Sequence, residues 1–238
     1  MRYESPLIRG TLVRRYKRFL ADVVLEDGSE TTVHCPNTGS MMGCQTPGSV
    51  VWLLPASNPA RKYPLGWELV EAEPSVLVGI NTGRSNALVA EALERKMIPE
   101  LAGYGAVRRE VTVPGTRSRI DFLLGGHQRD PDCYLEVKNV TAAVSGDEAF
   151  FPDAVSTRAV RHVDELAALV AQGHRSAMCF CVQRADVSRV RPADHIDPAY
   201  GKALRRAVRA GVEVYALRAE VTPASVRLEH RIPVELGR

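Results

Sequence analysis

The sequence contains no long apolar run and no recognisable export signal. Nothing in its 238 residues approaches the roughly 20 consecutive apolar residues that a membrane-spanning helix needs. The first ten residues, MRYESPLIRG, lack the apolar core of a signal peptide. We therefore expect a cytoplasmic protein without a membrane partner.

The chain also lacks the cysteine and histidine spacings that are typical of disulfide-rich proteins and zinc sites. Its five cysteines include no Cys-x-x-Cys motif, and an odd number cannot all pair internally. The six histidines are scattered without metal-ligand spacing. This usage fits a reducing cytoplasm better than a disulfide scaffold or a zinc site. The net charge is only +3, so any anionic partner has to be met by local patches.

What the chain does contain is an ordinary globular composition, 45% hydrophobic and 25% charged, arranged in two successive patterns. Residues 1–80 form short strand-like runs, and Asp27-Gly28 is a hairpin signal between two of them. The runs are LIRGTLV, FLADVVLEDG, ETTVHCP, GSVVWLLPA and WELVEAE. Several short strands with almost no helical periodicity predict a small β-barrel.

Residues 81–238 instead alternate between helical and strand-like patterns, which predicts an α/β fold. We expect helices at 86–97, stopped by Pro99, at 157–172, ended by Gly173, and at 199–211. The expected strands span 105–113, 118–124, 133–140, 176–182 and 212–217. Neither half of the sequence contains repeats or low-complexity segments.

The strand CYLEVKNV (133–140) carries an acid and a base on one face. Because side chains alternate along a strand, Glu136 and Lys138 share a face that Leu135 and Val137 do not. Asp121 occupies the charged face of the preceding strand, SRIDFLL. If the two strands pair as a hairpin, Asp121, Glu136 and Lys138 converge on one face of the sheet.

Such a cluster suits phosphoryl chemistry. Two carboxylates held close together bind a hard divalent cation, Mg²⁺ or Mn²⁺, which completes its shell with water and phosphate. The ion polarises a phosphoryl oxygen and lowers the pKa of a water that attacks it. Lys138 then orients that water or stabilises charge on the phosphate. A cross-strand salt bridge on a solvated face is the alternative interpretation of the same residues.

The order of elements resembles the PD-(D/E)XK nuclease core: helix, strand, strand with Asp, strand with Glu-x-Lys, helix, strand. Many members of that superfamily add a glutamate from the first helix. Glu91 in ALVAEALER is suitably placed to join Asp121 and Glu136 as a catalytic metal ligand. The alternative interpretation of Glu91 is an ordinary position on an exposed helix face, where it is spaced i, i+4 from Arg95.

Seven segments between residues 15 and 201 together resemble the sugar fermentation stimulation protein A family: RYKRFLADV, HCPNTGSM, NPARKYPLGWEL, SRIDFLL, CYLEVKNVT, FPDAVSTRAVRHVDEL and HIDPAYG. The resemblance implies an N-terminal OB-like β-barrel over 1–80 and a PD-(D/E)XK nuclease-like α/β domain over 81–238. It also implies a DNA-binding protein associated by name with the regulation of sugar use. The carboxylates and lysine of the nuclease pattern, Glu91, Asp121, Glu136 and Lys138, are all present.

Two basic features are candidate DNA contacts. The run RRYKR contributes Arg14, Arg15, Lys17 and Arg18. The helix 199–211 carries a stripe at i, i+3, i+4 and i+7: Lys202, Arg205, Arg206 and Arg209. We favour phosphate binding because two separate basic features occur in a nearly neutral chain. A solvated barrel strand and a stripe that complements the helix macrodipole are the structural alternatives.

For several other residues the sequence allows two interpretations. Tyr16 and the two tryptophans are able to stack on unpaired bases or to form barrel core. The loop HCPNTGSMMG (34–43) presents backbone N–H groups to an anion or builds a turn. Arg158 is placed to reach a phosphate near the metal, whereas we expect His162, one turn later, on a solvated helix face.

Three hypotheses follow from the sequence. The first is a DNA-binding protein, largely sequence-nonspecific, with a Mg²⁺-dependent phosphodiester-cleaving site. The second is a non-catalytic DNA-binding regulator of sugar (maltose-type) metabolism that keeps the nuclease fold. The third, a small-molecule binder, has no supporting motif. The sequence leaves the strandedness of the substrate and the oligomeric state open, and the first two hypotheses differ only in whether the charged face is used.

Overall fold

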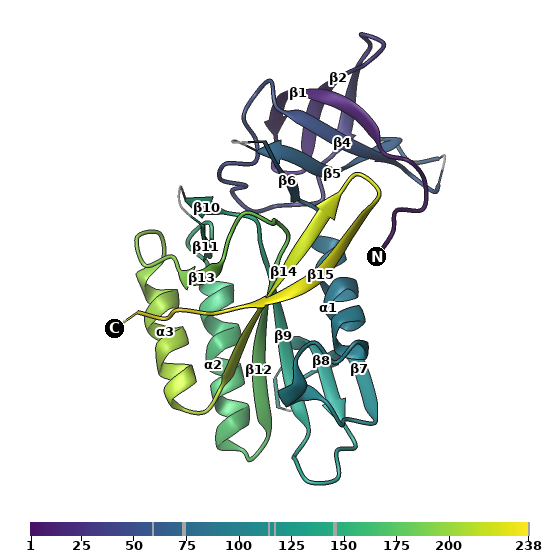
Figure 1. Ribbon diagram of the computed structural model, residues 1–238. Helices are drawn as coiled ribbons and strands as arrows, with labels where there is room; N and C mark the ends of the chain where they lie inside the picture. The colour runs from purple at the N-terminus through teal and green to yellow at the C-terminus, as the bar shows by residue number, and fades with distance from the viewer. Residues whose placement is uncertain (59, 73–74, 114, 117, 145–146, 238) are drawn as a thin grey trace.

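The structure is a computed structural model that describes residues 1–58, 60–72, 75–113, 115–116, 118–144 and 147–237. The chain first forms a barrel and then an α/β unit. In Figure 1 the barrel lies above the α/β unit. No helix within the described ranges is both long and apolar enough to cross a membrane.

Six strands build the barrel sheet: β1 (Ile8–Tyr16), β2 (Leu20–Leu25), β3 (Glu30–His34), β4 (Val50–Pro55), β5 (Leu65–Ala72) and β6 (Val76–Gly79). Their order is β3-β2-β1-β4-β5-β6, and a pairing of β3 with β5 closes the first five strands into a barrel. The hairpin turn predicted at Asp27-Gly28 joins β2 to β3, and Gly28 adopts the positive φ of +83° that such turns require.

The interior of the barrel is apolar because alternate residues of each strand point inward. Leu12, Val33 and Leu53 are among its fully buried side chains. Trp67 is also completely buried and donates its indole N–H to the carbonyl of Leu69. Trp67 therefore belongs to the barrel core, which removes it from the candidate stacking residues.

The α/β unit is built on a six-stranded sheet of order β15-β14-β12-β9-β8-β7. Its strands are β7 (Ala106–Thr112), β8 (Arg119–Gly125), β9 (Cys133–Val140), β12 (Arg175–Val182), β14 (Glu213–Thr222) and β15 (Ser225–Ile232). A second, three-stranded sheet contains β10 (Ala143–Val144), β11 (Glu148–Phe151) and β13 (Arg189–Pro192). The prediction that a small β-barrel is followed by an α/β unit is confirmed.

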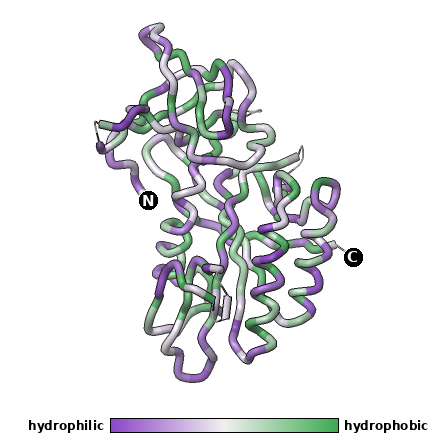
Figure 2. Tube along the Cα trace, turned by 180° about the vertical axis from the view of Figure 1, so that it is seen from behind, coloured by the Kyte–Doolittle hydropathy of each residue, from purple (hydrophilic) through white to green (hydrophobic). Residues whose placement is uncertain are grey.

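Helices cover both faces of the large sheet. Helix α1 (Ser85–Glu94) packs on one face, with Leu135 and Val137 of β9 beneath it. Helices α2 (Thr157–Ala171) and α3 (Pro198–Arg209) cover the other face (Figure 1). Figure 2 shows hydrophobic and hydrophilic residues alternating along α2 and α3, as expected for helices with one buried side. Two short 3-10 helices, η1 (Thr82–Arg84) and η2 (Pro99–Leu101), flank α1.

The first helix is shorter than predicted. It ends at Glu94 instead of residue 97, and Lys96 already has a positive φ of 55°. Pro99 does not stop the helix directly but opens η2, a position that tolerates proline because the first N–H groups of a helix have no intrahelical partner. The sequence patterns also missed β6, β10, β11, β13 and β15.

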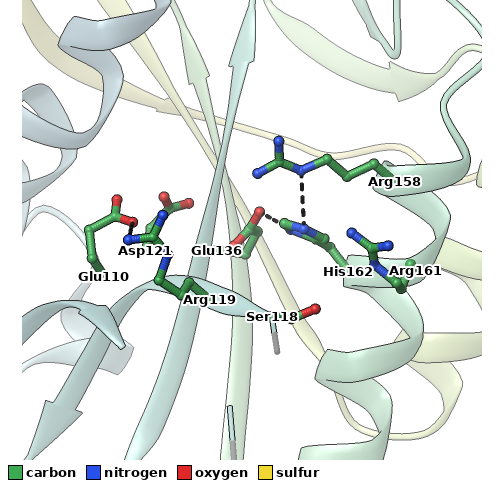
Figure 3. A pocket seen from close by; sticks show the side chains of 8 residues that line it. All are labelled: Glu110, Ser118, Arg119, Asp121, Glu136, Arg158, Arg161 and His162. Carbon is green, nitrogen blue, oxygen red and sulfur yellow. Dashed lines mark hydrogen bonds and ion pairs between the residues drawn. The ribbon is translucent and has the colours of Figure 1, made fainter. Parts of the chain in front are cut away.

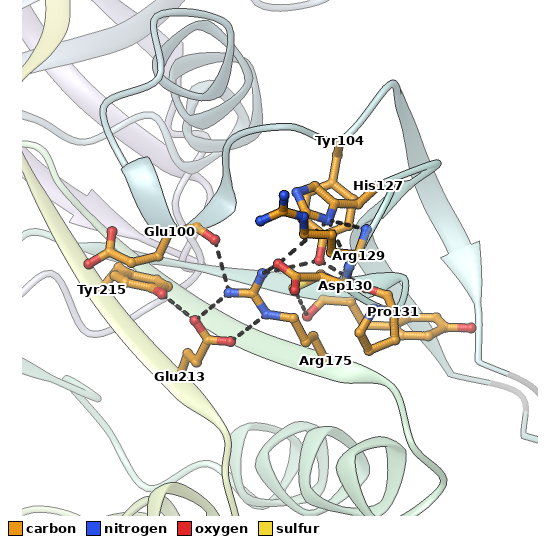
Figure 4. Close-up of polar contacts among 11 residues, drawn as sticks. Glu100, Tyr104, His127, Arg129, Asp130, Pro131, Arg175, Glu213 and Tyr215 are labelled. Atoms are coloured by element: carbon orange, nitrogen blue, oxygen red, sulfur yellow. Dashed lines mark hydrogen bonds and ion pairs between the residues drawn. The ribbon is translucent and has the colours of Figure 1, made fainter.

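A network of polar side chains fastens the end of the sheet where β12 and β14 begin (Figure 4). Arg175 donates two hydrogen bonds of 2.8 Å to the carboxylate of Glu213. It also donates to the hydroxyl of Tyr104 at 3.2 Å, to Asp130 at 3.2 Å and to the carbonyl of Glu100 at 2.9 Å. One guanidinium thus links two strands to the β8–β9 loop and η2.

Candidate functional site

Asp121 lies where two paired strands separate. The ladder between β8 and β9 runs from Leu124–Cys133 to Phe122–Leu135 and stops there. One residue further, the Asp121 side chain takes the place of a ladder partner: its Oδ2 accepts the backbone N–H of Val137 at 2.7 Å. Its Oδ1 accepts from Asn86 Nδ2, on α1, at 2.8 Å. The carboxylate is therefore held between β9 and α1.

Glu136 lies on the neighbouring strand β9 and is almost completely buried. Its Oε1 accepts a 2.6 Å hydrogen bond from Lys138 Nζ and contacts Nδ1 of His162. Its other oxygen, Oε2, is buried without a hydrogen-bond partner among the described residues. Buried polar atoms are rarely left unpaired, so this oxygen is a candidate ligand for a group that the chain itself does not supply.

The two carboxylates have opposite pKa shifts. Burial raises the pKa of Asp121 to about 6, and the nearby charge of Glu136 adds to the rise. Burial would also raise the pKa of Glu136, but its hydrogen bond with His162 and the charge of Lys138 outweigh that effect and place the pKa below its ordinary value. A negative charge on Asp121 is therefore costly unless a cation compensates it.

A cavity of about 400 Å³ opens over this pair. Figure 3 shows Glu110 and Asp121 on one side, Glu136 between them and α2, and three α2 side chains on the other side. The α2 residues are Arg158, Arg161 and His162, and Arg119 and Ser118 complete the lining. Arg158 donates to His162 Nε2 at 3.4 Å. Guanidinium groups thus surround a floor of carboxylates, an arrangement suited to an anionic group that is held through a cation.

The cavity continues toward the barrel as a groove. A second cavity of about 480 Å³ shares Asp121, Glu136 and Arg158 with the first and extends along Lys138 and Asn139. A third, of about 190 Å³, shares Asn139 and further residues with the second and reaches the barrel loop that contains Thr38. The carboxylates and the barrel therefore lie on one continuous path.

The structure brings together most of the predicted centre. Asp121, Glu136, Lys138 and Arg158 line the same groove, because β8 and β9 pair as the antiparallel hairpin that the prediction required. The prediction for Glu91 is corrected: it accepts the Met1 amino group at 2.8 Å and lies 3.5 Å from Arg227. The α1 residue that meets Asp121 is Asn86.

His162 is also corrected. It was expected on a solvated helix face, but it is buried against Glu136. A signal was present in the sequence: His162 is spaced i+3 from Ala159 and i−4 from Leu166, both of which belong to the buried stripe of α2. Glu110, Arg119 and Arg161 of the cavity were not predicted, because no local pattern distinguishes them from ordinary surface charges.

The RRYKR run divides into different roles. Arg15 is a structural residue, since one of its nitrogens donates to the carbonyls of Arg18, Asn37 and Gly39 at 2.7, 2.9 and 2.9 Å. Its assignment to DNA binding is therefore withdrawn. Arg14 is exposed and pairs with Asp22 at 2.8 Å. Lys17 and Arg18 are exposed in the β1–β2 turn.

The basic stripe of α3 lies apart from the groove. Arg205 forms an ion pair with Asp194 and donates to the carbonyl of Leu236 at 2.7 Å, so it fastens the C-terminal segment. Arg206 is 2.5 Å from Asp164, and Lys202 and Arg209 are exposed. Within the described ranges, none of the four lines the three cavities. Arg205 is thus withdrawn as a DNA contact.

Comparison with known proteins identifies the family. A model of the SfsA N-terminal OB domain matches residues 13–80, and a model of the sugar fermentation stimulation protein RE domain matches residues 83–225. The chain belongs to the sugar fermentation stimulation protein family. The resemblance read from the seven sequence segments is thereby confirmed, as is the OB character of the barrel.

Members of the sugar fermentation stimulation protein family match this chain over nearly its whole length. The homolog from Alkalilimnicola ehrlichii is 56% identical over 235 residues, covering 98% of this chain and 99% of the relative. The homolog from Thioalkalivibrio sulfidiphilus is 58% identical over 238 residues, covering 100% and 99%. The structure of Pyrococcus furiosus SfsA in complex with Ca²⁺ is similar with a TM-score of 0.87 at 26% identity, covering 98% of this chain and 97% of that one.

Proposed function

We propose that this protein binds DNA with little sequence preference and cleaves its phosphodiester bonds with Mg²⁺ or Mn²⁺ at the Asp121–Glu136 pair. The observation that carries the proposal is the buried Oε2 of Glu136, which has no hydrogen-bond partner in the described part of the chain and lies in a groove that Asp121 and Lys138 also line. The PD-(D/E)XK character of the α/β domain is part of the same proposal.

The residues present fit a hard divalent cation. Mg²⁺ in proteins takes one or two carboxylates and fills its remaining positions with water and phosphate. The described residues contain no group of three or more His, Cys, Asp or Glu side chains that could hold a metal ion, and the proposal uses the two carboxylates of Asp121 and Glu136. The related Pyrococcus protein was solved in complex with Ca²⁺, which also prefers oxygen ligands.

Asp121 and Glu136 would hold the ion, whose contribution when bound is to polarise a phosphoryl oxygen. The remaining tasks fall to side chains of the chain itself. Lys138 is held at Glu136 by a 2.6 Å hydrogen bond, which fixes an ammonium group at the groove where charge grows on the phosphate. Arg158 and Arg161 offer guanidinium donors to phosphate oxygens on the cavity rim.

Contacts with the DNA backbone are proposed along the same side of the groove. Lys17 and Arg18 lie in the turn between β1 and β2. Arg15 connects this turn to the loop at the third cavity, because it donates to the carbonyl of Arg18 and to the carbonyls of the loop residues Asn37 and Gly39. Backbone contacts of this kind carry no base readout, so affinity is expected to fall steeply with salt. We place this activity in the cytoplasm, since all five cysteines are free.

A DNA-binding regulator without cleavage is the second candidate. The observation that favours it is the Lys138 ammonium at Glu136, which already compensates one carboxylate. Incubation of labelled single- and double-stranded DNA and RNA with Mg²⁺, Mn²⁺ or chelator separates the two. Cleavage with either metal, lost in chelator and in Asp121→Asn, supports the nuclease. Salt-dependent binding without cleavage supports the regulator, and neither binding nor cleavage overturns both.

A further inference from the structure

The third cavity joins the barrel to the α/β unit. Its volume is about 190 Å³, and it is lined by Asn37, Thr38 and Gly39 from the barrel side and by Asn139, Phe151 and Asp153 among the residues opposite. Asn139 directly follows Lys138 on β9, so the cavity lies next to the proposed active site. Nothing in the proposed cleavage uses this space.

The side-chain amide of Asn139 has a fixed orientation. Gln183 Nε2 is 3.2 Å from the carbonyl oxygen of Asn81, which only accepts hydrogen bonds, so the Gln183 atom at that position has to be the nitrogen. The same nitrogen is 2.6 Å from a side-chain atom of Asn139, which therefore has to be the oxygen. Ser85 Oγ donates to this oxygen as well, at 2.9 Å.

The amide nitrogen of Asn139 is consequently turned away from the Gln183 cluster. Across the described part of the chain it forms no hydrogen bond, and it is not one of the buried unpaired polar atoms. Because Asn139 lines both the second and the third cavity, its N–H donors are available to a ligand in the groove.

Other residues that line the third cavity supply an acceptor and an apolar surface. Asp153 Oδ2 accepts the backbone N–H of Met41 at 3.0 Å, and the carboxylate borders the cavity. Its negative charge disfavours a phosphate there. Phe150 and Phe151 supply an apolar wall. Donor, acceptor and apolar wall together suit an uncharged ring with polar edges.

The size of the cavity limits the ligand to one such ring system. Drug-sized ligands occupy sites of roughly 300–1,000 Å³, well above the space available here. A nucleobase within a duplex has its edge paired and its faces stacked, and proteins that read a base in a pocket take it unpaired. A strand with free bases meets this condition without extrusion.

We propose that the third cavity binds one unpaired nucleobase, with Asn139 donating and Asp153 accepting hydrogen bonds at its edge. The proposal rests on the proposed function for the path of the strand, whose phosphate lies at Asp121 and Glu136. It names the substrate class: single-stranded DNA, or duplex ends and junctions that expose an unpaired nucleotide. The barrel then contributes the loop that closes the base site.

The test compares strand preference in variants of the cavity. Thr38→Trp fills the cavity from an exposed loop, with Thr38→Ser as the control that leaves it open. Asn139→Ala removes the donor, with Ser85→Ala as the control that breaks the same Ser85–Asn139 bond without removing the amide. Binding of single-stranded and duplex oligonucleotides is measured by fluorescence anisotropy in chelator, so that cleavage does not interfere.

Thr38→Trp and Asn139→Ala should weaken single-strand binding about ten-fold, within the range for loss of one base contact, while duplex affinity stays unchanged. Both controls should keep the single-strand preference. Equal losses on both substrates, or no loss on either, would overturn the base site. Since Thr38 is exposed, its variant decides the matter even if Asn139→Ala fails to fold.

A second measurement separates this inference from the proposed cleavage. Neutral deoxynucleosides carry no phosphate, so their binding, followed by NMR, needs neither metal nor the carboxylates of Asp121 and Glu136. Binding that survives Asp121→Asn and disappears in Thr38→Trp supports the base site even if no cleavage is found. Cleavage of DNA by a protein whose strand preference is unchanged in both cavity variants would leave the nuclease standing and remove the base site.

Discussion

Nδ1 of His162 lies against Oε1 of Glu136, and the two side chains are each only 5% exposed. The contact joins α2 to β9 directly beneath the groove. Because α2 is anchored through Val163 and Leu166 in the sheet core, the orientation of the Glu136 carboxylate depends on how this helix packs. A helix far along the chain thus positions a carboxylate that the sequence pattern assigned to a strand alone.

Replacement of His162 by Phe should destabilise the protein. The change leaves a buried carboxylate with Lys138 as its remaining partner, and breaking buried ionic or hydrogen-bonded pairs costs about 2–4 kcal/mol. Urea unfolding at pH 7 measures the loss. Arg161→Ala, on the same helix but 61% exposed, should stay within about 0.5 kcal/mol of wild type. Equal stability of wild type and His162→Phe would show that the contact contributes nothing.

Lys138→Ala should abolish most cleavage while leaving DNA affinity nearly intact. Lys138 is proposed to act on charge that develops only in the transition state, and such interactions raise kcat without tightening substrate binding. Single-turnover cleavage and anisotropy with the same oligonucleotide give the two quantities. If affinity falls in proportion to the rate, Lys138 is an ordinary phosphate contact.

Much of the charged centre followed from the sequence because strand geometry is periodic. Alternation fixed the shared face of Glu136 and Lys138, and the short connection between β8 and β9 made hairpin pairing the simplest arrangement for Asp121. The rotation of α1 about its axis depends on its packing against the sheet, which no local pattern reports. For that reason Asn86, and not Glu91, meets Asp121.

Long side chains were the other source of error. Arg15 reaches carbonyls 22 and 24 residues further along the chain, a partnership that a local run of basic residues does not reveal. The missed strand β15 did have a signal: Val226 and Leu228 are buried at alternate positions, with polar or charged residues on either side of each. A hairpin with β14 follows from that alternation and the turn at 222–225.

Arg15 and the pair Lys17–Arg18 should respond differently to alanine substitution. Arg15→Ala removes hydrogen bonds to three backbone carbonyls and should lower stability by about 1–3 kcal/mol. The double variant Lys17→Ala/Arg18→Ala should leave stability unchanged and flatten the slope of log affinity against log salt by roughly 1–2. A salt slope equal to that of wild type would remove the turn from the DNA interface.

The Arg175 network should be needed for stability and not for DNA binding. Its guanidinium is bound to a carboxylate, a hydroxyl and a carbonyl at once, so Arg175→Met leaves several partly buried partners unpaired. We expect a loss of about 2–4 kcal/mol in urea unfolding. Arg231→Met, which removes a half-exposed ion pair with Glu100, is the control and should cost under about 1 kcal/mol.

Asp121→Asn should stabilise the metal-free protein at neutral pH. A carboxyl group whose pKa rises from 3.8 to about 6 on folding loses about 3 kcal/mol of stability when it ionises, before any relaxation of its surroundings. The asparagine keeps the shape and removes the charge. Its carbonyl can accept from Val137, and the Asn86 amide can turn to accept from the new side chain. A net gain of about 1–2 kcal/mol is expected in chelator.

The stability difference between Asp121→Asn and wild type should depend on pH in one direction. The folded protein holds the Asp121 proton more tightly than the unfolded chain, so the contribution of Asp121 to wild-type stability falls as the pH rises from about 4 to about 6 and stays lower above that range. The advantage of Asp121→Asn should therefore be absent near pH 4 and complete above pH 6. Asp164→Asn removes a half-exposed carboxylate on α2 and is the control for the Asp-to-Asn substitution itself. A variant less stable than wild type at pH 7, with no growth of the difference above pH 4, would make Asp121 a structural salt-bridge partner and remove it from the metal site.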